Sequence, residues 1–590
     1  MIAGNEPREE CTIVGKCRSL GVFCMIVVLV AMLLTFPALI ILDIGGAPRV
    51  AVLATVALMP LAMSDAAWDI SALTLMQLVS PKVLERTVHL DGVPADAKTL
   101  VATSILLSRS SDLDEVLSIL EKNYLSNAVD NTYFCLLTDF VDGHACEAHG
   151  ERETLRRVES GIAGMNARYG EKFVLFHRHR SWNSYDEVWG GRERKRGKIE
   201  DLVSFLVDPA SVTPGVAVGA LAALEGVRYL ITLDADTRLP RGAVQELVGT
   251  ISHPTNRPVV DTELRMVIRG HAIVQPMPRT VSTDKYGSLL QRLMHCDGVP
   301  GLDYFQHVLG AGSYYGKGIV DVAAFHAVLK GRVPENTLLS HDLIEGCYLR
   351  SAISNHAHIE EEYPRTCQAE SIRRRRWIRG DWQSYPWLFA MVPNAIGKER
   401  STLSWLCRVK ILDNMRRSLV AVALLATLMV GWFAAIFDVW TLAVLVAWMS
   451  SWMATIVMFM SASRGRPSFS TIVKELLKRV VTASRLPYIA MDSVESTTIA
   501  LWRSLVSRKN MLEWTPSSEV NHQAPSIIAY GSSMKGGLCL SAAIFLYVAH
   551  QGFPPVTTVL CTVWLVGPII HWALDQPWGS SRGRRVEHKP

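Results

Sequence analysis

Apolar residues gather in long runs near both ends of the chain, whereas polar and apolar positions mix in the middle. Residues 20–42 carry no charge and are long enough to span a hydrocarbon core about 30 Å thick. Residues 418–437, 439–460 and 556–574 are further candidates, and residues 534–550 form a shorter one. The pattern predicts a membrane-anchored protein with a globular middle domain.

The run 50–63 has two interpretations, because an apolar segment this short is often a core or interfacial helix. Counting it as a span gives about six spans in all and puts both termini and the two large loops on one side. Those loops hold most of the Lys and Arg residues, as at 373–376, 474–479 and 582–585. The positive-inside rule therefore predicts a cytoplasmic middle domain.

Short β-rich runs alternate with helical stretches between residues 81 and 416. The expected strands are 99–103, 133–138, 172–177 and 229–233, and the expected helices are 113–122, 151–168 and 242–251. This alternation predicts a parallel α/β sheet with ligands at the carboxyl ends of its strands. Asp139, Asp234 and Asp236 come directly after such strands.

The composition supports this division and excludes other classes. Of 590 residues, 49% are hydrophobic and 19% are charged, below the charged fraction of about 25% that is usual in soluble domains. This excludes a disordered chain, a collagen-like fibre and a small disulfide scaffold. The net charge of +5 is too mild to indicate nucleic-acid binding, and the 11 cysteines are scattered, as expected of reduced intracellular thiols.

Two acidic motifs point to chemistry. Asp234 and Asp236 form a D-x-D at a strand end, a pattern that suits Mg²⁺ bound with substrate phosphates, although D-x-D also occurs by chance and at helix caps. Asp342 opens an expected helix, where a carboxylate is either a plain N-cap or, in a sugar transferase, the general base for an acceptor hydroxyl.

The segment 371–382 reads SIRRRRWIRGDW and precedes a predicted span. Four adjacent arginines are typical of a solvated charge run or a lipid contact, but the adjacent Trp377 favours a diphosphate and sugar site. The run 310–318 is glycine-rich without P-loop spacing, so it is either an ordinary turn or a place where the backbone approaches a bulky substrate.

Together these motifs resemble the processive family 2-type glycosyltransferases, which include cellulose and hyaluronan synthases. The resemblance implies a GT-A (Rossmann-like) α/β domain inserted in a bundle of membrane helices. It implies that Asp139 contacts the nucleotide, that Asp342 is the catalytic base and that Gly312 and Ser313 form the acceptor-site turn. Arg373, Arg376 and Trp377 match the Q-x-x-R-W element of that family.

Several runs are more similar to the cyclic β-1,2-glucan synthases of glycosyltransferase family 84. These are NTYFCLLTDF (131–140), ERKRGK (193–198), PEN (334–336), SHDLIEGCY (340–348), WIRGDW (377–382), ILDNMRRSL (411–419) and LEWT (512–515). The resemblance extends from about the second predicted span to the last.

This resemblance implies an inverting, processive transfer of glucose from UDP-glucose to a β-glucan, most simply β-1,2-linked, which then crosses the bilayer. It implies that Lys195, Gly197 and Lys198 hold the nucleotide sugar, and that Asp234 and Asp236 hold Mg²⁺ or Mn²⁺. The expected location is a bacterial inner membrane, and nucleic acid is not an expected partner.

Three features depart from the family patterns. Cyclic-glucan synthases are several times longer and carry phosphorylase-like domains, so we expect a stand-alone transferase core and a separate carbohydrate-processing or export partner. His341 and Arg373 stand where cellulose-type enzymes have Glu and Gln, in agreement with family 84. Ser104 and Ile105 replace an expected Pro-Thr near the nucleotide site.

Residues 469–520 begin with an amphipathic pattern that is typical of a helix at the inner membrane face. Trp514 and Thr515 form either a gating loop over the nucleotide or a structural interfacial turn. The predicted organisation is a tail (1–19), two spans (20–63), the transferase domain (64–416), two spans (417–460), interfacial helices (461–533), two spans (534–574) and a basic tail (575–590).

Two other functions share some of these motifs. A single-transfer glycosyltransferase with a lipid-linked acceptor would also use D-x-D and a base, but Arg373, Arg376 and Trp377 beside several spans favour processive synthesis. A membrane scaffold or transporter with a degenerate transferase domain would lack some catalytic positions, and every expected one is occupied.

Overall fold

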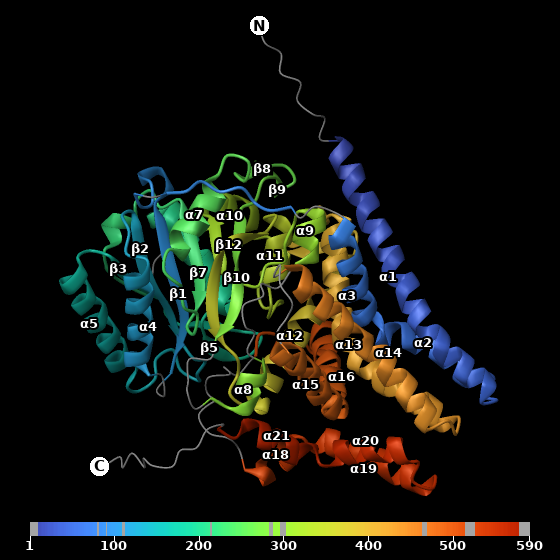
Figure 1. Cartoon of the computed structure of the whole chain (residues 1–590). Helices are drawn as coiled ribbons and strands as arrows, with labels where there is room; N and C mark the ends of the chain where they lie inside the picture. Colours follow the sequence, from blue (N-terminus) through green and yellow to red (C-terminus); the bar gives the residue numbers. More distant parts are fainter. Residues whose placement is uncertain are drawn as a thin grey trace.

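The structure is a computed structural model that describes residues 10–78, 82–89, 91–108, 112–212, 215–281, 287–294, 303–462, 469–513 and 526–577. Its centre is an eight-stranded sheet with helices on both faces. Helices from the two ends of the chain, blue and orange to red in Figure 1, lie beside and below this sheet.

The sheet has a parallel centre and antiparallel additions. In spatial order its strands are β12 (Ala352–Glu362), β10 (Ile273–Val281), β11 (Gly318–Asp321), β7 (Tyr229–Asp234), β1 (Thr99–Leu107), β2 (Thr132–Phe140), β3 (Phe173–His177) and β6 (Val216–Gly219). The strands β7, β1, β2 and β3 are parallel, as predicted. The prediction of a wholly parallel sheet was wrong, because β11 is antiparallel to β7 and β10, and β6 is antiparallel to β3.

Two hydrophobic cores lie on opposite faces of this sheet because side chains alternate along each strand. On one face, Val101 and Ile231 pack under α4 (Leu113–Ser126), α5 (Glu151–Tyr169) and α7 (Ala243–Ser252). On the other face, Leu100 and Leu230 pack under α6 (Arg194–Val207), α10 (Val322–Leu329) and α11 (Asp342–Tyr348). The helices predicted at 113–122, 151–168 and 242–251 are therefore confirmed as α4, α5 and α7.

The strand register brings the predicted acidic residues to one edge of the sheet. In the β1–β7 pair Ser104 lies opposite Asp234, and in the β1–β2 pair Leu106 lies opposite Asp139. In the sheet, β1 has β2, the next strand along the chain, on one side and β7 on the other side. The carboxyl ends of such diverging parallel strands are the usual ligand site of an open α/β sheet.

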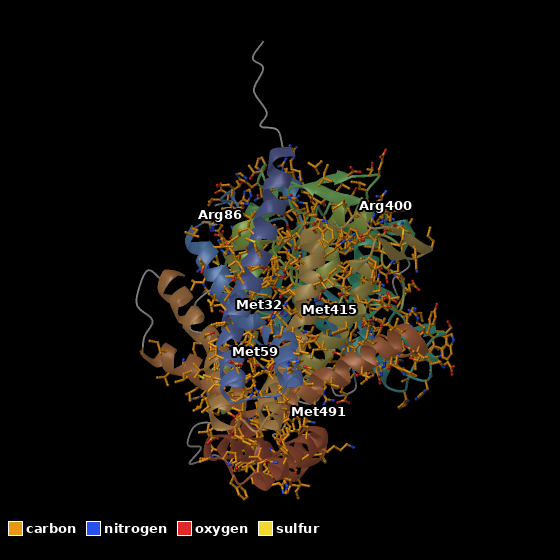
Figure 2. All side chains as sticks on the ribbon, turned by 90° about the vertical axis from the view of Figure 1, so that its right-hand side faces the viewer. Met32, Met59, Arg86, Arg400, Met415 and Met491 are labelled. Carbon is orange, nitrogen blue, oxygen red and sulfur yellow. The ribbon has the colours of Figure 1, made fainter. Side chains whose placement is uncertain are left out.

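Long apolar helices from both ends of the chain pack together. They are α1 (Glu10–Ile44), α2 (Arg49–Ala62), α3 (Ser64–Leu78), α13 (Trp405–Phe433), α14 (Asp438–Ala462), α19 (Lys535–His550) and α20 (Pro555–Leu565). Met59 of α2 is buried in one core with Leu428 and Trp432 of α13. Figure 2 shows Met32 of α1 and Met415 of α13 on the same face of the molecule.

The helices support fewer membrane spans than predicted. Among the described residues, Leu20–Ile44 and Trp405–Phe433 are long and apolar enough to cross a membrane, and the total reaches five only if each of three bent helix pairs is one span. The predicted total of about six is therefore not confirmed. The run 50–63 belongs to α2, which meets the length test only together with α3 across a 50° bend.

The predicted span 534–550 coincides with the single helix α19, which follows a sharp bend, whereas the predicted span 556–574 is broken into two helices. Ile527–Ser533 (α18) and α19 meet at 84°, and α20 and Gly567–Asp575 (α21) meet at 57°. Pro568 lies at the start of α21, where a proline is compatible with the first turn of a new helix. The predicted span 439–460 lies in α14, where the stretch Asp438–Ser450 is a shorter apolar helix.

A candidate active site at the carboxyl ends of the central strands

Asp139, one residue before the end of β2, is a fully buried carboxylate between two cations. Arg178 Nη2 donates to its Oδ2 at 2.8 Å, and Lys198 Nζ lies 2.8 Å from its Oδ1. Although burial raises the pKa of a carboxyl group, Lys198 and Arg178 hold the pKa of Asp139 below its usual value. Lys198 also donates to the Ile105 carbonyl at 2.7 Å, which fixes α6 to the end of β1.

Two glycines leave the space that the ion pairs of Asp139 with Arg178 and Lys198 occupy. A Cβ at Gly191 would lie 2.0 Å from Asp139 Oδ2, and a Cβ at Gly197 would lie 2.1 Å from the Arg192 carbonyl oxygen and 2.9 Å from Arg178 Nη1. Both positions therefore exclude any larger residue. Close packing therefore explains why residue 197 is a glycine. Its predicted contact with the nucleotide sugar stays a prediction.

Asp234 ends β7 and is held by two lysines. Lys195 Nζ of α6 donates to its Oδ1 at 2.6 Å, and Lys317 Nζ lies 3.0 Å from its Oδ2. Burial opposes ionisation, but the two ammonium groups keep the pKa of Asp234 well below its usual range. Lys317 also forms an ion pair with Glu361 of β12, whereas Asp236 is exposed.

Gly316 connects the Asp234 group with the predicted base. Its carbonyl oxygen accepts a hydrogen bond from Lys195 Nζ at 2.8 Å. Its φ is +81°, and a Cβ at this position would lie 2.5 Å from Asp342 Oδ1. The glycine-rich run therefore brings the backbone against Asp342. Its predicted approach to a bulky substrate stays a prediction.

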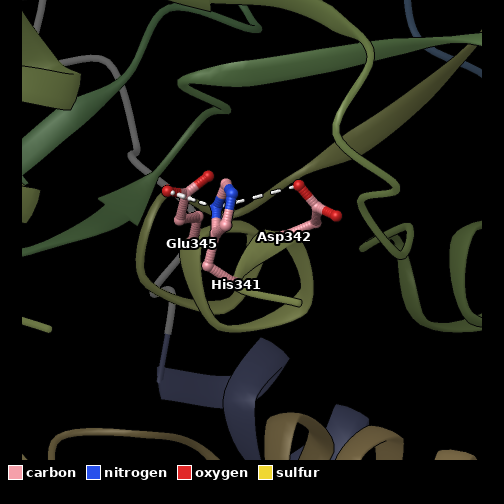
Figure 3. A group of neighbouring side chains, drawn as sticks. All are labelled: His341, Asp342 and Glu345. Carbon is pink, nitrogen blue, oxygen red and sulfur yellow. Dashed lines mark ion pairs between the residues drawn. The ribbon is translucent and has the colours of Figure 1, made fainter. Parts of the chain in front are cut away.

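Asp342 is the first residue of α11, beside a buried histidine (Figure 3). His341 Nδ1 lies 2.8 Å from Glu345 Oε1 and 3.8 Å from Asp342 Oδ1. Burial opposes the charge of His341, but Glu345 and Asp342 outweigh it and raise the pKa of His341. Ligand-type atoms of the three residues lie within 4.8 Å of one another, as in metal sites. In this group the protonated imidazolium form of His341 would be the positive partner of both carboxylates.

Arg376 lies in the field of both carboxylates of the site. It belongs to α12 (Cys367–Gln383), which lies between the sheet and the apolar helices in Figure 1. Burial lowers the pKa of the Arg376 guanidinium, while Asp234 and Asp342 oppose that shift. The structure therefore brings Arg376, Asp234 and Asp342 into one electrostatic group, as a site shared by donor and acceptor requires.

Arg373 and Trp377 lie one turn apart on α12. The Arg373 guanidinium stacks over the rings of Trp377 and Tyr363, with its carbon 4.8 Å and 5.1 Å from their centroids. The Trp377 side chain remains 48% exposed. An exposed indole backed by a cation provides a face on which a sugar ring can stack.

The other two arginines of the run point to the apolar helices instead. Arg374 Nη2 and Arg375 Nε donate to the two carboxylate oxygens of Asp492 at 2.9 Å and 2.8 Å, and Ser371 Oγ donates at 2.6 Å. Asp492 belongs to α16 (Leu486–Trp502), which follows α15 (Phe469–Ser484). The four adjacent arginines thus divide into one pair at the site and one pair that anchors the helix.

The predicted acceptor turn is tightly packed. The Gly312 carbonyl oxygen accepts hydrogen bonds from Lys410 Nζ of α13 at 2.6 Å and from Ser351 Oγ at 2.7 Å. The Ser313 amide donates to Asp303 Oδ2 at 3.2 Å. This turn therefore joins the sheet domain to α13, and its contact with an acceptor stays a prediction.

The predicted gating residues Trp514 and Thr515 lie outside the described residues. The chain just before them packs on α12, where Arg379 Nη2 donates to the Glu513 carbonyl oxygen at 2.8 Å. Neither interpretation of this loop is tested.

Sequence reasoning missed several partners within the site. Arg178, Lys317, Glu361 and Asp492 lie in other elements than the motifs whose charges they balance. The position of Lys317 between two glycines in the run 310–318 was the one sequence signal that could have marked it as a site residue. The pairings depend on strand order, which the sequence pattern does not specify.

A mixed α/β sheet with carboxylates at its strand ends, joined to candidate membrane helices, is consistent with a membrane-associated glycosyltransferase. No family model matches the chain. Over 577 residues, or 94% of this chain, it is 33% identical to the curated cyclic beta-(1,2)-glucan synthase NdvB of Rhizobium meliloti (strain 1021). The resemblance to cyclic β-1,2-glucan synthases is thereby confirmed. The aligned region covers 20% of that relative, so the chain spans about one fifth of its length.

Proposed function

We propose that this chain is a membrane-embedded, inverting and processive glycosyltransferase that polymerises glucose from UDP-glucose into a β-glucan. The similarity to a cyclic beta-(1,2)-glucan synthase supports a glucan product and favours the β-1,2 linkage. Candidate membrane helices beside the site support release of the polymer across the bilayer. The basic loops favour a cytoplasmic domain at a bacterial inner membrane.

The observation that carries this proposal is that Asp342 lies against Gly316, whose carbonyl oxygen and Asp234 share the ammonium group of Lys195. Arg376 lies in the field of both carboxylates. In the proposed reaction Asp342 removes the proton from an acceptor hydroxyl, which attacks the anomeric carbon in line with the departing UDP. A general base must lie within hydrogen-bond reach of the proton that it takes. The Asp342 carboxylate lies against the Gly316 backbone and is partly exposed.

Cations along the strand ends suit the diphosphate of the donor. Lys195 and Lys198 of α6 and Arg376 of α12 would offset charge that develops on the leaving UDP. The exposed Asp236 carboxylate fits Mg²⁺ or Mn²⁺, which when bound would neutralise diphosphate charge. Asp234 could join this site only by releasing a lysine, since both of its oxygens are paired.

The acceptor would approach from the side of α12. Trp377, exposed and stacked on Arg373, is the proposed platform for the terminal sugar of the glucan. Because Asp492 ties α12 to α16, a growing chain on this platform lies next to the apolar helices. Processive synthesis needs such a site, which holds the product between additions.

The decisive experiment supplies labelled UDP-glucose and Mg²⁺ to membranes that contain the protein. The expected result is a polymer with β-1,2 linkages, absent from membranes with the Asp342→Asn variant. Addition of one sugar to a lipid-extractable product would replace the proposal with a single-transfer enzyme. Failure to transfer or hydrolyse any UDP-sugar would favour a non-enzymatic membrane scaffold.

A further inference from the structure

Lys317 enters the site at a fixed point of the backbone. The flanking Gly316 and Gly318 have φ values of +81° and +154°, and a Cβ at Gly318 would lie 2.7 Å from the Val274 carbonyl oxygen. The lysine directly precedes β11, which is paired on both sides within the sheet. Its ammonium group is therefore delivered from a rigid turn.

This ammonium group and that of Lys195 occupy both oxygens of Asp234. Lys195 lies 2.6 Å from Oδ1 and Lys317 lies 3.0 Å from Oδ2, and Lys317 also pairs with Glu361. An ammonium group held between two carboxylates is favoured in its charged form.

The charges around Asp234 determine how strongly the site attracts a divalent cation. Lys195 and Lys317 pair with Asp234 and Glu361, and the third carboxylate, Asp236, lies with Asp234 in the field of Arg376. An arriving Mg²⁺ or Mn²⁺ would find one carboxylate outside these ion pairs and two ammonium groups that repel it. Such ions commonly bind through one or two carboxylates together with substrate phosphates. A diphosphate would supply both the missing oxygens and new partners for the lysines.

We propose that Lys317, with Lys195, is the resident counter-ion of Asp234, so that a divalent cation binds well only together with a nucleoside diphosphate. The inference deepens the proposed function and rests on it for the identity of the diphosphate. In the free protein Lys317 stands where the cation would bind Asp234. On donor binding its ammonium group turns to a phosphate oxygen, and Asp234 becomes available.

The test measures Mn²⁺ binding to the purified full chain in detergent, through loss of the free Mn²⁺ signal in electron paramagnetic resonance. Without nucleotide, Lys317→Met should bind Mn²⁺ about tenfold more tightly than wild type, because a repelling charge is gone. Lys317→Arg keeps the charge and should behave as wild type. Lys330→Met, which removes an exposed lysine at the end of α10, is the matched control.

UDP provides the second arm. In wild type, UDP should increase Mn²⁺ affinity at least tenfold, and in Lys317→Met this increase should shrink. Unchanged or weaker Mn²⁺ binding by both Lys317→Met and Lys195→Met, with wild-type unfolding temperatures, would overturn the inference. The nucleotide-free arm needs neither donor nor activity, so failure of glucan synthesis and failure of this inference are distinguishable.

Discussion

Arg375 of α12 and Asp492 of α16 form an ion pair with 2.6 Å between Nη2 and Oδ1. Arg374 pairs with the same carboxylate at 2.9 Å, so one acidic residue holds both arginines. At about 100° per residue, Arg375 and Arg374 point about 100° and about 200° away from Arg376 around the helix axis. The pair therefore fixes the rotation of α12, which aims Arg376 and Trp377 at the site.

Replacement of Asp492 by Asn should weaken both stability and glucan synthesis. The side chain of Asp492 is only 9% exposed, so the substitution removes the buried carboxylate that Arg374 and Arg375 share, at a cost of roughly 2 kcal/mol. Among the described residues, Arg374 then keeps only Glu370, and Arg375 keeps only Glu495. Thermal unfolding in detergent and synthesis from labelled UDP-glucose measure the two effects. Glu495→Gln is the control, because that half-exposed residue contacts Arg375 at 3.0 Å from the outside. Equal behaviour of both variants would refute the positioning role.

Replacement of Asp342 by Asn should abolish turnover while UDP binding persists. Loss of a general base typically costs about a hundredfold or more in rate. The isosteric amide keeps the contact with Gly316, and His341 retains Glu345 as its nearer partner. Product formation and equilibrium binding of UDP are measured on the same preparation. Asp114→Asn, at an exposed position of α4, should leave both unchanged. A near-wild-type rate in Asp342→Asn would remove Asp342 from the proposed mechanism.

The parts of the fold that depend on local pattern were predictable. The strands β1, β2, β3 and β7 and the helices α4, α5 and α7 carry clear hydrophobic periodicity, and the sequence located them within a few residues. The short strands β6 and β11 have only four residues each, and their antiparallel direction follows from the path of the chain. The break before α21 lies inside an apolar run, so counting such runs does not locate the helix ends, and the total of about six spans is not confirmed among the described residues.

The same division holds for the site. Asp139, Asp234 and Asp342 could be located because strand ends and helix starts are visible in the sequence. Their counter-charges could not, since Lys317 reaches Asp234 only because β11 is inserted beside β7. A sequence motif identifies residues that lie close together along the chain. An ion pair between two elements can be predicted only when the order of the strands in the sheet is known.

Replacement of Gly316 by Ala should impair catalysis more than folding. An alanine at φ +81° costs roughly 1 kcal/mol in backbone strain. Its Cβ would also collide with Asp342 Oδ1 at 2.5 Å, which displaces the base. Gly397→Ala is the matched control, because Gly397 also has positive φ but no atom within 4 Å of the added Cβ. Synthesis rate and unfolding temperature should separate the two variants. A Gly316→Ala enzyme as active as Gly397→Ala would contradict the contact.

The His341 group should make stability depend on pH. Its imidazole faces Glu345 and Asp342 of its own segment and Arg196 of α6. Glu200 of α6, which pairs with Arg196 at 2.8 Å, also belongs to this charge network. The two carboxylates of α11 favour the imidazolium, whereas Arg196 and burial oppose it, and the net result is a raised pKa of His341. In the unfolded chain a histidine titrates at about pH 6.5.

A group whose pKa is raised on folding stabilises the fold fully below its unfolded pKa and loses that contribution as pH rises through the folded pKa. Wild-type stability should therefore decrease as pH rises above about 6.5, by about 1.4 kcal/mol per unit of pKa shift. His341→Gln should flatten this slope, whereas His144→Gln, at an exposed histidine, should retain it. Unfolding temperatures of the three proteins between about pH 6 and pH 9 measure the slopes. Parallel curves for wild type and His341→Gln would show that His341 is neutral in the folded protein, and the ion pair with Glu345 would then have to be replaced by a neutral hydrogen bond.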